Sequence, residues 1–502
     1  MTSATSAVSV RRRIVPFLLI PLLALGALAG WAFASPVGSS PDDDFHLVSI
    51  WCGSDASAEF CSPATADDER VVSRDLFASP FCFVRVPEAS ADCQRFGSDL
   101  NENAQPTDRG NFDGLYPPVY YAAMSAFAGP DIQVSVLTIR IVNSGFFVFL
   151  VTALCALLPA RRRPTLLATI ALTVVPLGVF LIPSTNPSSW ALLSASVLWM
   201  ALLGYFESRG WRRAALAVVA AIALVAGAGA RADSAIYAGV AIAAVVILCA
   251  RRTRAFVVAA IVPAVFAVVA LALFFSAQQS AAASTGLVDN PVAVHNGYTL
   301  LVGNLLELPW LLTGPFGTWK LGWLDTLLPA IVPFGALAAL AVAVMVGLRD
   351  MTRRKMIAAL FVLALVVIVP FYLLYTSDAV VGTQVQPRYI LPLIILLVGL
   401  VLVRVSDAPG TTRPWQAWFV AAALSIANAV ALHTNIRRYT TGVDAIGGNL
   451  DRNPEWWWNL PVSPMGVWAI GTVAFAATLF WLAALWNRRA PRTTPSITDA
   501  TV

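Results

Sequence analysis

Long apolar stretches alternate with short polar turns along most of this chain. A helix that crosses a membrane needs about 20 apolar residues, and about twelve stretches approach that length. They lie at residues 14–34, 134–158, 165–182, 188–206, 214–230, 233–250, 255–275, 326–348, 356–375, 388–403, 415–432 and 465–486. The pattern therefore predicts an all-α, polytopic membrane protein.

Composition leads to the same class. Of the 502 residues, 58% are hydrophobic and 12% are charged, and the mean hydropathy is +0.73. A soluble core does not need that much apolar surface. These values exclude an ordinary soluble globular protein.

Arginine-rich turns mark one side of the predicted bundle. The clusters are Arg11 to Arg13, Arg161 to Arg163, Arg209 with Arg212 and Arg213, residues 251–254, Arg349 with Arg353, Arg354 and Lys355, Arg404 with Arg413, and Arg488, Arg489 and Arg492. Of the 28 acids, this side holds only Glu207, Asp350, Asp407 and Asp499. Because basic loops stay cytoplasmic, we predict a multi-pass protein of the cell membrane with both termini cytoplasmic and an acidic outer face.

The net charge of +5 then reflects the basic turns that set the membrane topology. It predicts contact with anionic membrane lipids and no nucleic-acid partner.

The chain divides into an N-terminus with the first helix (1–34), an outer loop with a juxtamembrane helix (35–133), helices 2–7 (134–275), a second outer segment (276–325), helices 8–11 (326–432), a third outer segment (433–464), the last helix (465–486) and a cytoplasmic tail (487–502).

The first segment has a second interpretation. Three arginines, an apolar run and small residues at 32–34 also resemble a secretory signal with its cleavage site. The apolar run is about 20 residues, longer than the usual 7–15 of a signal. We therefore expect a retained helix.

The first outer loop holds Cys52, Cys61, Cys82 and Cys93. In an oxidising compartment these cysteines predict two disulfides. Four cysteines can be joined in three ways, and the sequence does not choose among them. A zinc site is the alternative, but the loop has no CxxC spacing and no paired histidines. Cys155 and Cys249 fall inside apolar stretches and are expected to be small core residues.

Further outer material follows this loop. Residues 116–130 begin Tyr-Pro-Pro-Val-Tyr-Tyr and are too short to cross, which favours an interfacial helix. The outer segments at 276–325 and 433–464 carry tryptophans that an interfacial aromatic belt would also explain. Together these segments could cover a cavity.

The first candidate for chemistry is an acidic run directly after the first helix, Asp42, Asp43 and Asp44, followed by His46. Three adjacent carboxylates repel one another, which raises at least one pKa and suits a general base. The same run could hold a divalent cation, and no other cofactor is indicated. A solvated turn is the alternative interpretation.

Several cations are expected at the same depth on the outer side: Arg140, Arg231 and Arg388. Asn186 lies at this level too, and Asp233 follows Arg231 closely. Mutual pairing, such as Arg231 with Asp233, and snorkelling to the interface would explain these charges. If these arginines lie opposite the acidic run at 42–44, however, they would suit a ligand that carries a phosphate.

Four short motifs resemble a known family. They are Pro-Asp-Asp-Asp-Phe-His at 41–46, Asn-Pro-Ser at 186–188, Gly-Trp-Leu-Asp at 322–325 before Leu-Pro at 328–329, and Gln-Pro-Arg-Tyr at 386–389 before Leu-Pro at 391–392. The chain resembles, from the first helix to about the tenth, an uncharacterised bacterial family of predicted membrane proteins. That family is similar in layout to the GT-C glycosyltransferases.

The resemblance implies a GT-C-like fold and an inverting transfer of a hexose or pentose. The donor would be a polyprenyl-phosphate sugar, and the acceptor a glycan or another cell-envelope molecule. An acid at the start of the first outer loop would be the base, and a Pro-Pro-aromatic helix, here at Pro117 and Pro118, would follow. The family's glutamate is Asp43 here, so either Asp42 or Asp43 could reach the acceptor.

Roles follow for the remaining residues. His46 would orient the base, and Arg388, Arg231 and Arg140 would bind the donor phosphate. Asp42 and Arg388 are expected to face each other across one open, lipid-accessible hollow. The predicted substrate-binding residues are Asp44, Asn186, Asp233, Trp323, Asp325, Gln386 and Tyr389.

Two other classes of function remain open. A transporter or flippase of lipid-linked sugars would use the same arginines without cleaving the donor. A non-catalytic envelope-assembly protein would neither bind a donor nor cleave one. The sequence shows no evident inverted repeat and no nucleotide-binding loop. These observations favour the transferase.

Overall fold

The computed structural model describes residues 3–53, 59–97, 100, 103–281, 297–383, 385–404 and 413–488. Within these ranges nine helices are long and apolar enough to cross a membrane. They are α5 (Ile132–Leu157), α8 (Ser188–Glu207), α9 (Gly210–Ala228), α10 (Ala232–Cys249), α11 (Arg254–Phe275), α14 (Ile331–Gly347), α15 (Arg353–Thr376), α17 (Pro414–Thr440) and α18 (Pro464–Arg488). The chain is a multi-pass membrane protein.

The other predicted spans are shorter or interrupted. Helix α1 (Ser3–Phe33) includes nearly all of the first predicted stretch at 14–34, whereas α16 (Pro387–Leu402) has 16 residues. The stretch predicted at 165–182 forms α6 (Arg163–Thr173) and α7 (Leu177–Leu181). The break falls at Pro176, which has no backbone N–H to continue the helix. The expected number of about twelve spans is therefore not matched by nine full-length helices among the described residues.

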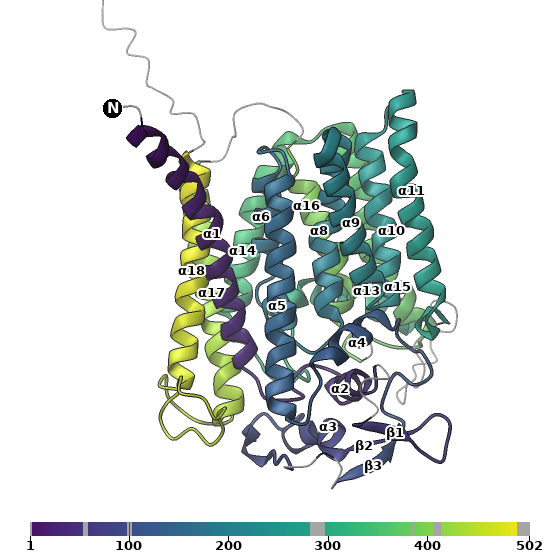
Figure 1. The fold of residues 1–502 in the computed structure, drawn as a ribbon, viewed down its shortest axis with the longest axis vertical. Helices are drawn as coiled ribbons and strands as arrows, with labels where there is room; N and C mark the ends of the chain where they lie inside the picture. The colour runs from purple at the N-terminus through teal and green to yellow at the C-terminus, as the bar shows by residue number, and fades with distance from the viewer. Residues whose placement is uncertain are drawn as a thin grey trace, which may run out of the picture.

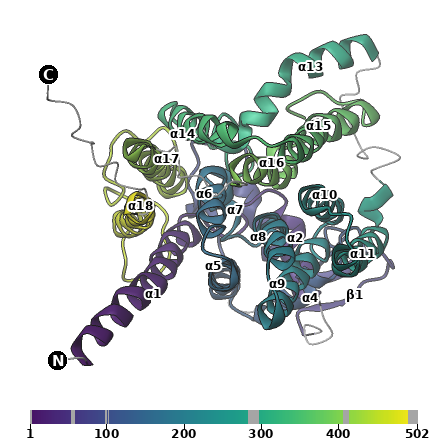
Figure 2. The same ribbon diagram turned by 90° about the horizontal axis from the view of Figure 1, so that it is seen from above.

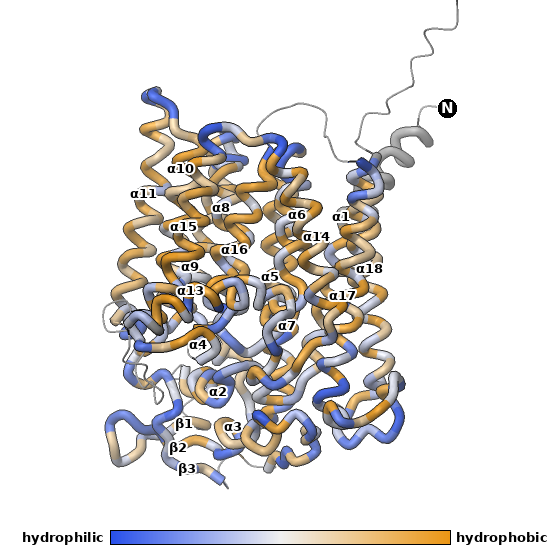
Figure 3. Tube along the Cα trace, turned by 180° about the vertical axis from the view of Figure 1, so that it is seen from behind, coloured by the Kyte–Doolittle hydropathy of each residue, from blue (hydrophilic) through white to orange (hydrophobic). Residues whose placement is uncertain are grey.

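Arginine-rich turns gather at one end of the bundle. Figure 1 shows the first residues of α1 and the end of α18 at this end, with the turns from α5 to α6, α8 to α9, α10 to α11 and α14 to α15. The opposite end carries the folded outer loop. Figure 3 shows hydrophobic residues along the helices between two hydrophilic ends. The predicted separation of basic turns from the large loops is thus present in three dimensions.

The loop between α1 and α5, which we call the first outer loop after its predicted side of the membrane, is a small disulfide-linked subdomain. It contains α2 (Asp43–Trp51), β1 (Cys61–Pro63), β2 (Arg70–Ser73), α3 (Arg74–Ala78), η2 (Ser79–Cys82), η3 (Ala91–Cys93), β3 (Ala104–Thr107), α4 (Val119–Met124) and η4 (Ser125–Phe127). The strands form an antiparallel sheet in the order β1-β2-β3. Disulfides join Cys52 to Cys61 and Cys82 to Cys93, as two bridges were expected.

The other outer segments contain more helix than the sequence predicted. Helix α13 (Gly297–Thr313), followed by η6 (Gly314–Phe316), lies in the segment predicted as a loop at 276–325. Figure 2 shows α13 along its length, while α10 and α16 are viewed nearly end-on, so α13 lies across the bundle. Helix α17 continues to Thr440, well past the predicted end at 432. Short 3-10 turns also occur at η5 (Gln278–Ala281) and η7 (Leu348–Asp350).

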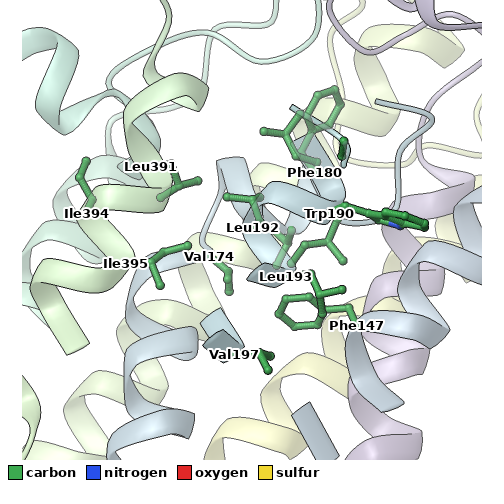
Figure 4. Packing of buried hydrophobic residues seen from close by; sticks show 14 of the residues in the cluster. Phe147, Val174, Phe180, Trp190, Leu192, Leu193, Val197, Leu391, Ile394 and Ile395 are labelled. Atoms are coloured by element: carbon green, nitrogen blue, oxygen red, sulfur yellow. The ribbon is translucent and has the colours of Figure 1, made fainter. Parts of the chain in front are cut away.

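Apolar side chains from several helices form the packing below the outer loop. Figure 4 shows Phe147 of α5 beside Leu193 and Val197 of α8, with Leu391 and Ile395 of α16 on the far side of Val174 and Leu192. All seven are buried. This packing fixes α16, and with it Arg388 in its first turn, against α8.

Some predicted features lie outside the described residues. They are the tail from 489 onward with Arg489, Arg492 and Asp499, and Asp407 in the turn after α16.

The disulfide pairing gives the first testable prediction. Proteolysis of the unreduced protein should release one peptide pair joined through Cys52 and Cys61 and another through Cys82 and Cys93. Mass spectrometry before and after reduction identifies both pairs. A peptide that links Cys61 to Cys82 would show that the loop folds differently.

Candidate functional site

The three consecutive aspartates point into three different environments. Asp42 is the N-cap of α2 and has φ 61, in the left-handed region, whereas Asp43 and Asp44 form the first turn of the helix. A left-handed residue turns its side chain away from the direction that a helical residue would give it. The run is therefore not one acidic cluster.

Asp42 forms an ion pair with Arg388. Its Oδ2 accepts a hydrogen bond from Nη2 of Arg388, which also donates to the Tyr389 hydroxyl at 3.1 Å. Nη1 of Arg388 donates to the Pro41 carbonyl at 3.2 Å. The Arg388 side chain is 2% exposed and that of Asp42 is 39% exposed. Burial alone would raise the pKa of Asp42, but the guanidinium of Arg388 holds it below its usual value.

Asp43 is enclosed by the protein, and its hydrogen-bond partners are uncharged. Its Oδ2 accepts from the Ser40 backbone N–H at 2.9 Å and its Oδ1 accepts from the Thr185 hydroxyl at 2.9 Å. The side chain is fully buried. Burial raises its pKa to about 7, against the opposing charge of Arg140. Asp43 therefore joins the start of α2 to the turn before α8.

Asp44 forms a second ion pair, with Arg109 of the outer loop. Its Oδ2 accepts from Nη2 at 2.6 Å and from Nε at 2.9 Å. The Arg109 side chain is half exposed, whereas Asp44 is buried. Burial raises the pKa of Asp44, although Arg109 opposes the change.

His46 lies one helical turn further on, among aromatic rings. Its Nδ1 is 2.9 Å from the Tyr121 hydroxyl, and its ring centroid is 5.4 Å from that of Tyr116. Burial lowers the pKa of His46 to about 3, so the ring is neutral at physiological pH. If the Tyr121 hydroxyl donates to Nδ1, the neutral ring carries its proton on Nε2.

A third ion pair joins Arg231 to Asp233. Nε donates at 2.9 Å and Nη2 at 2.8 Å to the carboxylate, as the local pairing interpretation predicted. The guanidinium carbon of Arg231 lies 5.1 Å from the ring centroid of Tyr389, and that of Arg388 lies 5.0 Å from the same centroid. Tyr389 therefore holds two buried arginines near each other by cation–π contact.

Unsatisfied polar atoms gather around these three ion pairs. Within the part of the chain that the structure describes, these buried atoms have no hydrogen-bond partner: Asp44 Oδ1, His46 Nε2, Arg231 Nη1 and Arg388 Nε. Buried polar groups are nearly always paired, by protein or by water. An anion could accept from the two arginines, and a hydroxyl could donate to the free oxygen of Asp44.

Other predicted site residues have structural partners. Arg140 donates to the carbonyls of Ala32, Ser35 and Pro36 at 2.5–2.9 Å, and to the Ser39 hydroxyl at 3.1 Å. This places its guanidinium on the chain that leaves α1, apart from the Arg388 pair. Asn186 likewise donates to the Pro41 carbonyl at 2.8 Å.

Two predicted substrate-binding residues connect outer segments to each other. The Trp323 indole donates to the Gly38 carbonyl at 2.8 Å. Asp325 accepts from Arg438 at 3.0 Å and from the Arg85 backbone N–H at 3.2 Å. Both ends of the Asp325–Arg438 pair are buried. These contacts join the segment at 322–325 to the chain before α2, to the first outer loop and to α17.

A pocket opens beside Arg388 on the side of α7. It is partly open to solvent, and its cavity volume is about 20 Å³. Its walls include Leu177, Phe180 and Leu181 of α7, together with Lys320, Gln386 and Arg388. A cavity of this size holds about one water-sized group, and its two cations suit an anionic one.

Sequence reasoning did not find Arg109, Thr185 or the ring contacts of Tyr121. Arg109 lies in a polar loop with no periodic pattern, and Thr185 precedes a motif that drew attention only to Asn186. Their roles depend on partners 65 and 142 residues away. Among the described residues, no group of three or more His, Cys, Asp or Glu side chains is arranged to hold a metal ion.

Comparison with known families agrees with this architecture. Residues 25–397 match the family described as "Predicted membrane protein (DUF2142)", and the chain belongs to that family. No curated protein and no solved structure matches the chain.

The environment of Asp43 predicts a pH-dependent stability. Because its folded-state pKa is raised from 3.8 to about 7, its contribution is most favourable at low pH and is lost as the pH rises from about 4 to about 7. Asp43→Asn cannot lose a proton, so its stability relative to the wild type should increase across this range, by at most about 4 kcal/mol. Apparent melting temperatures in detergent between pH 4.5 and 8.5 measure the difference.

Asp113→Asn is the matched control, since Asp113 is exposed on the same loop. Its difference from the wild type should not vary with pH. A constant difference for Asp43→Asn would show that Asp43 is ionised throughout.

Proposed function

We propose that this protein is a GT-C-like membrane glycosyltransferase that moves a sugar from a polyprenyl-phosphate donor to an extracytoplasmic envelope acceptor. The observation that carries the proposal is the Asp42–Arg388 ion pair, surrounded by unsatisfied buried donors beside an apolar pocket. A carboxylate and a buried guanidinium in contact are the two groups that transfer from a lipid phosphate requires.

Asp42 is the base in this proposal. Of the three aspartates, Asp43 and Asp44 are buried, whereas Asp42 is partly exposed and can reach an acceptor. The acceptor hydroxyl gives its proton to Asp42 as its oxygen bonds to the anomeric carbon. The anomeric carbon–oxygen bond breaks at the same time, and its electron pair leaves with the lipid phosphate. Attack opposite the leaving group inverts the anomeric configuration.

Arg388 and Arg231 stabilise the departing phosphate. Each has one buried N–H without a partner, and charge-assisted hydrogen bonds strengthen as negative charge develops on the leaving oxygen. The donor phosphate would approach beside the small pocket at α7, where Lys320 adds a third cation. The neutral His46 and the free oxygen of Asp44 would contact sugar hydroxyls.

The position of these groups favours surface chemistry over transport. The aspartates and arginines meet at the loop-bearing end of the bundle, not at its middle. Transporters place their substrate sites near the bilayer midplane. A flippase is therefore the second candidate and forms the alternative outcome of the test.

Removal of the base should abolish transfer. We expect Asp42→Asn to lower the release of polyprenyl phosphate by about 100-fold or more, as for the loss of a general base. Purified protein in liposomes would be incubated with radiolabelled polyprenyl-phosphate hexoses and pentoses and an envelope extract as acceptor. Asp113→Asn, on the same loop, should release lipid phosphate at the wild-type rate.

Two outcomes would contradict parts of this proposal. One is release of lipid phosphate at the wild-type rate by Asp42→Asn, which would remove Asp42 as the base but leave the transferase standing. The other is intact donor in the opposite leaflet with no free lipid phosphate, which would identify a flippase.

A further inference from the structure

The two groups that the proposed reaction uses block each other at rest. Both Nη atoms of Arg388 are engaged, by Asp42, the Pro41 carbonyl and Tyr389, and only Nε is free. A carboxylate held by a guanidinium is a weak base, and a guanidinium neutralised by a carboxylate is a weak anion ligand. Asp42 and Arg388 must therefore separate before either can act.

Asp42 is the partner that can move. Arg388 is enclosed by the Pro41 carbonyl and the Tyr389 ring, whereas the Asp42 side chain is 39% exposed. Asp42 also has φ 61, a left-handed conformation that is unfavourable for most residues and is held here by its surroundings. Asp43, which follows it, is fixed by two hydrogen bonds. Rotation at Asp42 alone would free its carboxylate.

Charge balance explains how displacement would change the basicity of Asp42. The three ion pairs of the site, Asp42–Arg388, Asp44–Arg109 and Asp233–Arg231, leave no net charge among their members. An incoming phosphate that takes Arg388 adds a negative charge and leaves the Asp42 carboxylate unpaired. A nearby negative charge favours the protonated form of a carboxyl group, so the released Asp42 becomes a stronger base.

We infer that the phosphate of the lipid-linked donor displaces Asp42 from Arg388, so that the base becomes competent only when the donor is bound. This inference rests on the proposed function, since it assigns the order of events at the same site. It also explains how a protein with an exposed carboxylate could avoid activating an acceptor, or water, in the absence of the donor.

The test measures competition between Asp42 and phosphate, and it does not need turnover. Binding of dodecyl phosphate and of inorganic phosphate to the full-length protein in nanodiscs would be compared between variants. Asp42→Asn should bind dodecyl phosphate about five- to tenfold more tightly than the wild type, because the competing carboxylate is gone. If Asp42 and phosphate occupied Arg388 together, the affinity would stay the same or fall.

Two further variants make the result specific. Asp42→Gly should show the same gain, and glycine is favoured at φ 61, so this variant should fold. Asp44→Asn removes an equal charge two residues away but breaks the pair with Arg109. A gain in Asp44→Asn as large as that in Asp42→Asn would overturn the inference, because general charge neutralisation would then explain it.

The inference and the proposed function can fail separately. Tighter binding by Asp42→Asn without any sugar transfer by the wild type would support the displacement and reject the transferase. Sugar transfer by the wild type with unchanged affinity in Asp42→Asn would support the transferase and reject the displacement. Inorganic phosphate that binds as well as dodecyl phosphate would show that the lipid chain adds nothing, while the comparison between variants would still decide the displacement.

Discussion

The structure depends on how the irregular chain between α1 and α2 satisfies its backbone. Residues 33–40 are almost entirely buried and not helical after Phe33, so their carbonyls need partners from elsewhere. Side chains from α5, α17 and the outer loops supply them. The donors are Arg140 to Ala32, Ser35 and Pro36, Trp458 to Phe33, Asn435 to Ala34, Gln94 to Val37 and Trp323 to Gly38. The chain then leads directly into Asp42, so these bonds determine where the ion pair with Arg388 forms.

This constraint also explains why adjacent aspartates behave differently. Because the preceding chain is fixed, α2 starts at a defined position, and Asp42 takes the left-handed conformation that joins the two. Asp43 then faces the turn before α8, and Asp44 faces Arg109 of the loop. Repulsion within the acidic run is relieved by separation in space and by two arginines.

The sequence predicted the features that depend on local patterns. Apolar periodicity located most helices, basic turns predicted which ends lie together, and loop cysteines predicted two disulfides. Asp42 and Arg388, 346 residues apart, were expected to face each other across an open hollow; the structure brings them together, but as a direct ion pair with no hollow between them. The sequence could not reveal the partners of Arg140, because a buried arginine that binds carbonyls and one that binds a ligand have the same local pattern. It also missed Arg109, and it placed a loop where α13 forms, since both depend on long-range packing.

Burial of an arginine does not by itself mark a binding site. Arg438 and Arg388 are both buried, both paired with an aspartate, and both have an unsatisfied Nε. In the Asp325–Arg438 pair neither side chain exceeds 5% exposure, and the arginine also donates to the Phe83 and Ala89 carbonyls. Its partners cannot exchange without opening the outer segments. In the Asp42–Arg388 pair the carboxylate is exposed to 39%, and our proposal is that a ligand replaces it while the guanidinium stays in place. An exchangeable partner, and not burial, is what distinguishes a buried charge available to a substrate from one that holds the fold together.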